Sequence, residues 1–270
     1  MKRDLQATAG FPLFFDPETL RIEAGAGLSF GRTSRKVADL REVLLSPQAS
    51  PPETELYAMC ELENAPDAQK QVLAHLGLTY SLVLLPPLRV GAEFVKTHGH
   101  YHPPIPGTQQ SFPEVYTQLY GSLYLLLQKR DPEDPEQIAD CALAHMTPGY
   151  VITIPPGYAH VLINASHGPA LMAGLYGRAF KPDYGPVRAK GGLAYYLVDQ
   201  DGELGIIPNP RYANPPALRR LGELAGTPFE PPVPGVPVWK SFLAHPGAYA
   251  FLTQSEAAHR RFPPPAIGAA

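Results

Sequence analysis

Three histidines alternate along the segment KTHGHYH at residues 96–102. In a β-strand, residues two apart point to the same face, so His98, His100 and His102 are expected to project together. Neighbouring imidazoles on one face can hold a single metal ion. A lone histidine is usually an ordinary polar residue at a strand edge, but three in alternation favour a metal site.

A second motif surrounds another histidine, in the segment GYVITIPPGYAHVLIN at residues 149–164. Its spacing reads G-x5-P-x-G-x2-H-x3-N. The turn P-P-G at 155–157 redirects the chain, and the strand expected after it carries His160. Between the two histidine segments, Glu114 precedes Gly121 with the spacing E-x6-G. This second motif strengthens the hypothesis of a metal site.

The segments that position these motifs are predicted to be strands. Between about residues 78 and 207, short apolar, β-branched and aromatic runs recur, with glycine or proline between them. That rhythm is typical of an antiparallel sandwich or barrel, and the segment AEFVKTH is expected to be one of its strands. Proline (33) and glycine (24) make up about a fifth of the 270 residues, which argues against a helix bundle.

The rest of the chain divides into two appendages. We expect residues 1–55 to form an N-terminal arm packed on a barrel of residues 56–212. Residues 213–270 form a proline-rich C-terminal extension, in which PALRRLGELAG is expected to be a short helix. Two other short helices are expected, in VADLREVLL and PDAQKQVLAHL.

Composition and charge exclude several classes of protein. Hydrophobic residues make up 44% of the chain and charged residues 17%, as in globular proteins. The net charge of −3 argues against a nucleic-acid binder. The stretch LVLLPPLRV is too short to span a bilayer, so no membrane partner is expected. Cys60 and Cys141 lie outside any CxxC pair, which suits a reducing compartment and predicts a cytoplasmic protein.

The two motifs together resemble the two-part signature of the cupin superfamily. A closer resemblance, along residues 11–212, is to the cupin-type glucose-6-phosphate isomerases. It is carried by F-V-K-T-x-G-H-Y-H, then E-V-Y with L-x-G, then P-P-x-x-A-H-x-x-x-N, and D-Y-G at 183–185. The resemblance implies an all-β fold, a cupin double-stranded β-helix (jelly-roll) barrel with short peripheral helices and N- and C-terminal extensions. It also implies a homodimer.

Carried over by position, the resemblance assigns the metal ligands to His100, His102, Glu114 and His160. Three imidazoles and a carboxylate suit one divalent transition metal ion, Fe, Mn, Ni, Zn or Co, better than Ca or Mg. Four ligands on an octahedral ion leave two positions open, as in a catalytic site. His98 falls where the family has a residue that is not a ligand, so it lies at the rim of the pocket or replaces a ligand.

The resemblance also implies the substrate, a small phosphorylated sugar. Thr97 and the backbone N–H of Gly99 fall where the family contacts the sugar phosphate. Tyr116, Tyr176 and Tyr184 match tyrosines of the pocket, and their alternative role is core packing. The implied reaction is the interconversion of glucose 6-phosphate and fructose 6-phosphate.

Two courses of the reaction stay open. In one, Glu114 is the base that carries a proton between C1 and C2, with Tyr176 as the second catalytic residue. In the other, Glu114 remains a ligand and the hydrogen moves as a hydride. Two other functions also stay open, an Fe(II) dioxygenase with the same ligands and a sugar-binding cupin without activity.

The chain departs from the family pattern in two places. The eleven residues PPIPGTQQSFP (103–113) exceed the spacing of the family and are expected to bulge outward near the mouth of the pocket. Val83 and Pro182 replace two residues that contact phosphate in the family. Lys181, or alternatively Lys96 or Arg178, is expected to supply the cation that a phosphate requires. These three residues are also candidates for ordinary surface charges. The sequence leaves the source of this cation open.

Overall fold

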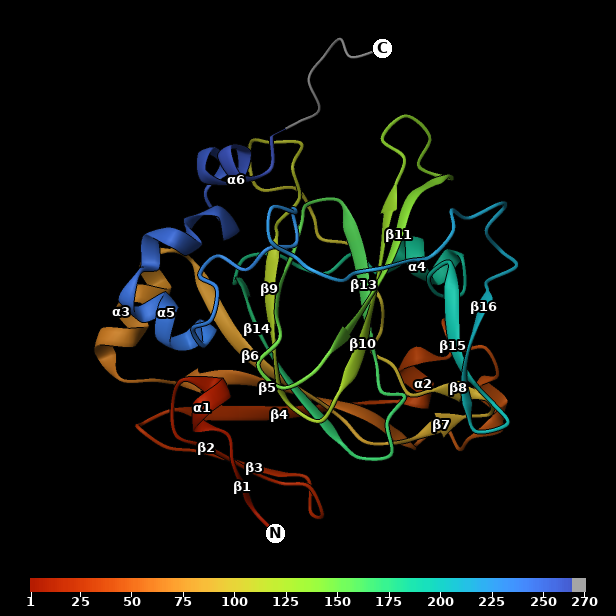
Figure 1. The fold of residues 1–270 in the computed structure, drawn as a ribbon, viewed down its shortest axis with the longest axis horizontal. Helices are drawn as coiled ribbons and strands as arrows, with labels where there is room; N and C mark the ends of the chain where they lie inside the picture. The colour runs from red at the N-terminus through yellow and green to blue at the C-terminus, as the bar shows by residue number, and fades with distance from the viewer. Residues whose placement is uncertain (264–270) are drawn as a thin grey trace.

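Two β-sheets form the centre of the molecule, which the computed structural model describes over residues 1–263 (Figure 1). The larger sheet runs in the order β12 (Val151–Ile154), β9 (Glu114–Tyr120), β14 (Ala170–Gly177), β6 (Leu78–Leu85), β5 (Glu55–Asn64) and β4 (Ser29–Lys36). The smaller runs in the order β13 (Tyr158–Ile163), β10 (Leu123–Arg130), β11 (Ile138–Met146) and β17 (Arg219–Arg220). The prediction of an all-β barrel with short peripheral helices is confirmed.

The larger sheet is apolar on both faces. Successive residues of a strand point to opposite sides. In β6, Val83 and Leu85 therefore join the core between the two sheets, while Leu82 and Leu84 join a second core outside it. The second core also contains Trp239 and residues of the N-terminal arm. Both appendages thus cover the outer face of the barrel wall.

A third sheet runs in the order β16 (Glu203–Pro208), β15 (Tyr195–Gln200), β8 (Glu93–Phe94) and β7 (Arg89–Val90). The N-terminal arm forms a fourth, small sheet of β1 (Arg3–Asp4), β2 (Leu13–Asp16) and β3 (Arg21–Ala24). The same region also supplies β4, which pairs along its length with β5. Part of the expected arm is therefore a strand of the barrel wall itself.

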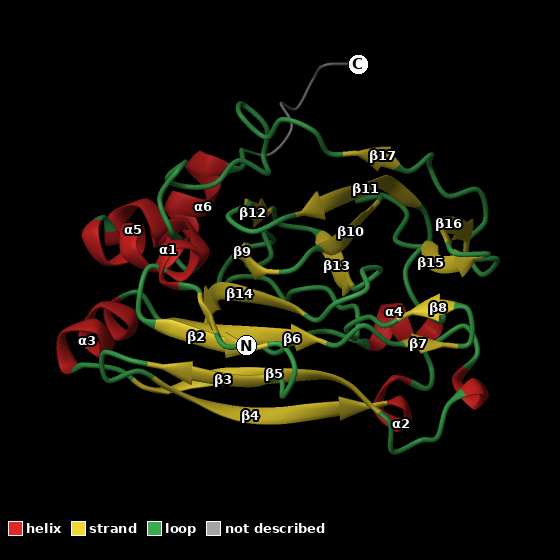
Figure 2. Cartoon of the chain, turned by 60° about the horizontal axis from the view of Figure 1, so that its bottom comes forward, coloured by secondary structure: helices red, strands yellow, loops and turns green. Residues whose placement is uncertain are grey.

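The helices are short and peripheral (Figure 2). α1, α3, α5 and α6 gather on one side of the sheets, and α2 and α4 lie on the other. α3 begins after Pro66 and ends before Gly77, whose φ of +62° is a conformation that glycine adopts most readily. The helices are α1 (Gln6–Ala9), α2 (Val37–Leu40), η1 (Pro47–Ala49), α3 (Asp67–His75), α4 (Gly185–Ala189), α5 (Val238–Ala244), η2 (Pro246–Leu252) and α6 (Ser255–Arg261).

Two predictions about local structure are wrong. The segment PALRRLGELAG is not a helix, because Arg219 and Arg220 pair in parallel with β11 and form β17. The segment AEFVKTH is a strand only at Glu93–Phe94. Beyond it, residues 95–102 are irregular and make isolated bridges to other parts of the chain. The three alternating histidines therefore do not share one face of a strand.

None of the helices within residues 1–263 combines the length and the apolar character needed to cross a membrane.

Candidate metal centre

The irregular segment 95–102 runs beside β13 and brings the two histidine motifs together. The backbone N–H of Thr97 donates to the Leu162 carbonyl at 2.9 Å, and the N–H of Asn164 donates to the Val95 carbonyl at 2.9 Å. The N–H of His160 donates to the His100 carbonyl at 3.3 Å. This irregular pairing sets the imidazole of His100 against that of His160, with ring centroids 4.6 Å apart.

Strand β9 supplies the carboxylate. Glu114 is its first residue, and Gly121 follows its last, so the E-x6-G spacing spans one strand. Gly121 has a φ of +65°, and a Cβ there would lie 2.5 Å from the Pro169 carbonyl oxygen. Only glycine fits this turn. The spacing of the motif therefore reflects the length of the strand that aims Glu114 into the barrel.

Four side chains converge where these segments meet. Ligand atoms of His100, His102, Glu114 and His160 all lie within 4.8 Å of one another. The Nε2 atoms of His100 and His102 are 3.3 Å apart. Glu114 Oε2 lies 3.4 Å from His102 Nε2 and 3.5 Å from His160 Nε2. Within the described chain, His98 lies outside this group.

Burial favours the neutral form of each group whose pKa is shifted. It lowers the pKa of His100 to about 3, with His102 adding to the effect. It lowers the pKa of His160 well below the ordinary value, again with its neighbouring histidines contributing. Burial also raises the pKa of Glu114, although contacts with His102 and Tyr116 oppose the rise. Neutral imidazoles are the form that binds metals.

The hydrogen bonds at the other ring nitrogens orient these imidazoles. His102 Nδ1 lies 2.7 Å from the Phe112 carbonyl oxygen, and His100 Nδ1 lies 3.3 Å from the His98 carbonyl oxygen. A carbonyl oxygen can only accept a hydrogen bond, so each Nδ1 carries the proton and each neutral imidazole keeps a lone pair on Nε2. Lone pairs that face one another without a donor are unfavourable when buried. A transition metal ion fits this set of donors.

Three tyrosines surround the cluster or approach it. The Tyr116 hydroxyl lies 2.9 Å from His160 Nε2, and Tyr176 is the register partner of Glu114 across β9 and β14. Burial raises the pKa of both hydroxyls, so both stay protonated near neutral pH. The ring of Tyr184 lies 5.5 Å from that of His100. All three predicted pocket tyrosines therefore lie at or beside the cluster.

Sequence reasoning missed Gly174. This glycine sits in the buried strand β14, where a Cβ would approach Glu114 Oε1 to 2.9 Å and the Tyr116 ring to 3.2 Å. Its missing side chain leaves the space that these two side chains occupy. The available signal was a glycine inside an otherwise apolar strand, which marks a close approach.

The remaining predicted site residues lie around the cluster. Thr97 Oγ1 accepts from the backbone N–H of Leu162 at 3.0 Å, so its oxygen is partly committed to the fold. Gly99 is buried beside the segment's histidines. His98 Nδ1 faces the Gly99 carbonyl, and its ring packs on Tyr184 at 4.4 Å. Lys181 is exposed on the connection that leads to Tyr184.

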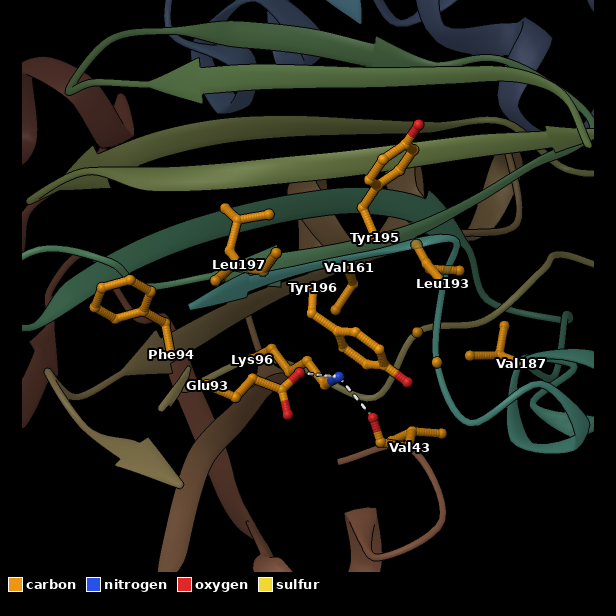
Figure 3. A pocket seen from close by; sticks show the side chains of 13 residues that line it. Val43, Glu93, Phe94, Lys96, Val161, Val187, Leu193, Tyr195, Tyr196 and Leu197 are labelled. Carbon is orange, nitrogen blue, oxygen red and sulfur yellow. Dashed lines mark hydrogen bonds and ion pairs between the residues drawn. The ribbon is translucent and has the colours of Figure 1, made fainter. Parts of the chain in front are cut away.

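Lys96, an alternative source of a cation for phosphate, is already paired. Its ammonium group is buried in an ion pair with Glu93 and donates to the Val43 carbonyl at 2.6 Å (Figure 3). It also lies 4.9 Å from the centre of the Tyr196 ring. The pocket drawn in Figure 3 surrounds this ion pair and not the histidine cluster. The suggestion that Lys96 binds phosphate is therefore wrong.

The 103–113 insert is only partly an outward bulge. Pro106 and Gly107 at its tip are exposed, but Ile105 and Phe112 are buried in the outer core. Gln110 Nε2 donates to the Phe262 carbonyl at 3.0 Å, which ties the insert to the C-terminal extension. Because the Phe112 carbonyl accepts from His102, the base of the insert also orients a predicted ligand.

Comparisons with known proteins show which family the chain resembles. A family model described as "Glucose-6-phosphate isomerase (GPI)" matches residues 34–212. The glucose-6-phosphate isomerase of Thermococcus gammatolerans is 30% identical over 206 residues, covering 73% of this chain and 97% of that protein. That of Pyrococcus horikoshii is 26% identical over 212 residues, covering 75% of this chain and 100% of that protein.

Among solved structures, a variant of the oxalate decarboxylase of Bacillus subtilis has a TM-score of 0.33 and 15% identity, covering 50% of this chain and 30% of that chain. The family match ends at residue 212, so the C-terminal extension lies outside it.

Proposed function

The chain belongs to the glucose-6-phosphate isomerase family, and on this premise we propose that it interconverts glucose 6-phosphate and fructose 6-phosphate at a bound metal ion. It is an isomerase that acts in glycolysis and gluconeogenesis. The observation that carries the proposal is the convergence of His100, His102, Glu114 and His160 from separate segments. These four residues hold the ion.

The ion is a divalent transition metal, one of Fe, Mn, Ni, Zn or Co, because three imidazoles and one carboxylate form a borderline set of donors. When bound, it supplies a Lewis acid that stabilises negative charge on the neighbouring oxygens at C1 and C2 of the sugar. The remaining chemistry belongs to side chains of this protein.

Glu114 is the base. It removes the proton from C2 of the open-chain aldose and returns it to C1, while the hydroxyl proton moves from O2 to O1. The Glu114 carboxylate lies within the histidine cluster, beside the position of the reacting carbons, and in its ionised form it can accept a proton and return it.

The tyrosines orient the reacting end of the sugar. Tyr116 and Tyr176 flank Glu114 and keep their hydroxyl protons near neutral pH because burial raises their pKa values. Each can therefore donate a hydrogen bond to a sugar oxygen. Tyr176 assists Glu114 from the neighbouring strand, at the register position opposite it. Thr97, Gly99 and the ring of Tyr184 line the path toward the other end of the substrate.

The protein functions as a homodimer in the cytoplasm. The cytoplasmic assignment is supported by two buried cysteines that form no disulfide with each other. The homodimer rests on the family resemblance, and light scattering that gives the mass of one chain would contradict it.

The decisive experiment is a coupled assay with fructose 6-phosphate on protein stripped of metal and then reloaded with each candidate ion. We expect no turnover without metal and turnover with at least one ion. Solvent deuterium appearing at C2 of the product would support proton transfer through Glu114, whereas retention of the original hydrogen would indicate a hydride shift. Absence of turnover with every ion, together with oxygen consumption on loading with Fe(II), would favour a dioxygenase instead.

A further inference from the structure

A phosphorylated sugar requires a cationic partner for its phosphate group. In an open-chain hexose 6-phosphate, this group lies at the opposite end from C1 and C2. The phosphate subsite must therefore lie beyond the metal ligands, by about the length of the sugar. Lys96 cannot serve, because it is buried in its pair with Glu93. Val83 and Pro182 carry no charge.

Tyr184 links the ligands to an arginine. Its ring lies 5.5 Å from the ring of His100 and 5.5 Å from the guanidinium carbon of Arg188. Arg188, on α4, also donates from Nε to His98 Nε2 at 3.2 Å. The Arg188 side chain is 45% exposed, so a ligand in solution can reach it.

A second guanidinium approaches from the wall of the barrel. Arg35 on β4 is the register partner of Tyr57 on β5, so the two side chains lie side by side on the same face of the sheet. Tyr57 is 3% exposed, and its hydroxyl accepts from the backbone N–H of His98 at 3.3 Å. Arg35 thus lies beside Tyr57 and Arg188 beside Tyr184, and His98 contacts both Tyr57 and Arg188.

We propose that Arg35 and Arg188 bind the phosphate group of the substrate, between the hydroxyls of Tyr57 and Tyr184. This inference rests on the proposed function, since it assigns the far end of the same substrate. Arginine suits the task because its planar guanidinium binds two phosphate oxygens at once. The two arginines replace the phosphate contacts that the chain lacks at positions 83 and 182.

A carboxylate lies next to the proposed phosphate subsite. Glu42 Oε2 lies 3.5 Å from Arg188 Nε, and the Glu42 side chain is 69% exposed. The phosphate displaces this weak surface pair when it binds. The ionisable groups facing the subsite are then Arg35, Arg188, the displaced Glu42 and His98.

The test compares Arg35→Gln and Arg188→Gln with Arg32→Gln, a control on the same strand as Arg35 that pairs with Glu55. The readouts are KM and kcat for fructose 6-phosphate and calorimetric binding of glucitol 6-phosphate, which cannot isomerise. We expect each of the two variants to raise KM and weaken glucitol 6-phosphate binding roughly 10- to 100-fold, with kcat much less affected. Arg188→Lys restores part of the loss, and Arg32→Gln behaves as the wild type.

Two further variants sharpen the assignment. Glu42→Gln is expected to tighten competitive inhibition by inorganic phosphate, because the competing carboxylate is gone. Lys181→Gln tests the alternative cation. If both arginine variants melt like the wild type and bind glucitol 6-phosphate within about twofold of it, the assignment to arginine is overturned. If only Lys181→Gln bound glucitol 6-phosphate more weakly, the phosphate contact would be assigned to Lys181. Failure of the wild type to turn over with any metal would instead reject the proposed function.

Discussion

The segment 93–102 contributes residues to two groups of buried ionisable side chains. The charges in these two groups are balanced in different ways. Glu93 and Lys96 are 1% and 6% exposed and form an ion pair. Leu45 N–H donates to Glu93 at 2.8 Å, and Lys96 donates to the Val43 carbonyl. In the histidine cluster, by contrast, free lone pairs of His100 and His102 face each other and the carboxylate of Glu114.

The contrast separates a structural role from a functional one. Buried polar groups are normally hydrogen-bonded to partners within the protein. The ion pair follows this rule and therefore needs no ligand. The histidine cluster departs from it, since the Nε2 atoms of His100 and His102 and the carboxylate of Glu114 share one buried space. An arrangement of this kind is typical of a site completed by a cation.

The largest effect on stability is expected when the ion pair is broken. Lys96→Met leaves Glu93 buried without its counter-charge, which should lower the free energy of unfolding by about 3–5 kcal/mol. The metal content of the folded protein should stay the same, because Lys96 is not a ligand. Chemical denaturation and metal analysis of the purified protein measure the two effects.

The double variant Glu93→Gln/Lys96→Met is the matched control. It removes both charges, so it should recover much of the lost stability. If Lys96→Met alone were as stable as the wild type, the pair would not have the structural role that we assign to it.

In the histidine cluster, a substitution should instead reduce activity while stabilising the metal-free protein. Glu114→Gln keeps the size of the side chain but removes a ligand and the base, so turnover is expected to fall roughly 10²- to 10³-fold. The metal-free variant should nevertheless be more stable than the metal-free wild type at neutral pH. The reason is that burial raises the pKa of Glu114, so folding disfavours its ionised form.

The sign of this pH dependence can be measured. Stability of the metal-free wild type should fall as the pH rises from the unfolded pKa of about 4.3 through the raised folded pKa, and the variant should lack this fall. Saturating metal should raise the melting temperature of the wild type, by an amount equivalent to about 2.7 kcal/mol at 100 times the dissociation constant. Equal metal stabilisation of Glu114→Gln would contradict its role as a ligand.

The smallest effect is expected at a third, partly exposed pair. Arg219 of the C-terminal extension binds Asp140 on β11 through Nε at 2.8 Å and Nη2 at 2.6 Å, and Tyr158 donates to the same carboxylate at 2.6 Å. Burial acts to raise the pKa of Asp140, but these hydrogen bonds and the charge of Arg219 hold it below the ordinary value. The side chain of Asp140 is 24% exposed and that of Arg219 is 45% exposed, so solvent weakens the pair.

Asp140→Asn should therefore cost only about 1 kcal/mol at neutral pH. Because the folded pKa is depressed, this stabilisation is complete above the unfolded pKa of about 3.9 and is lost as the pH falls through the folded pKa. Unfolding free energies of the variant and the wild type should thus converge in acid. A difference that persisted below the folded pKa would show that shape, and not charge, stabilises this contact.

Much of the candidate site was predictable because its motifs are local. The P-P-G turn predicted the strand that carries His160. The helix expected at 216–226 was wrong because pairing with β11 outweighed a helical pattern that is short and contains Gly222. Gly174 was missed because its importance depends on side chains from another strand.

The sequence by itself determined the donor types, their order along the chain and the β-rich fold, because these depend on residue identity and short-range periodicity. The alternating spacing alone did not determine which histidines join the cluster, and His100 and His102 were assigned only through the family resemblance. That choice depends on the irregular pairing of residues 95–102 with β13, which sets His100 beside His160 and sends His98 toward Tyr184 and Arg188. Tertiary structure likewise decided that Lys96 is a structural cation, because its partners come from parts of the chain that only folding brings together.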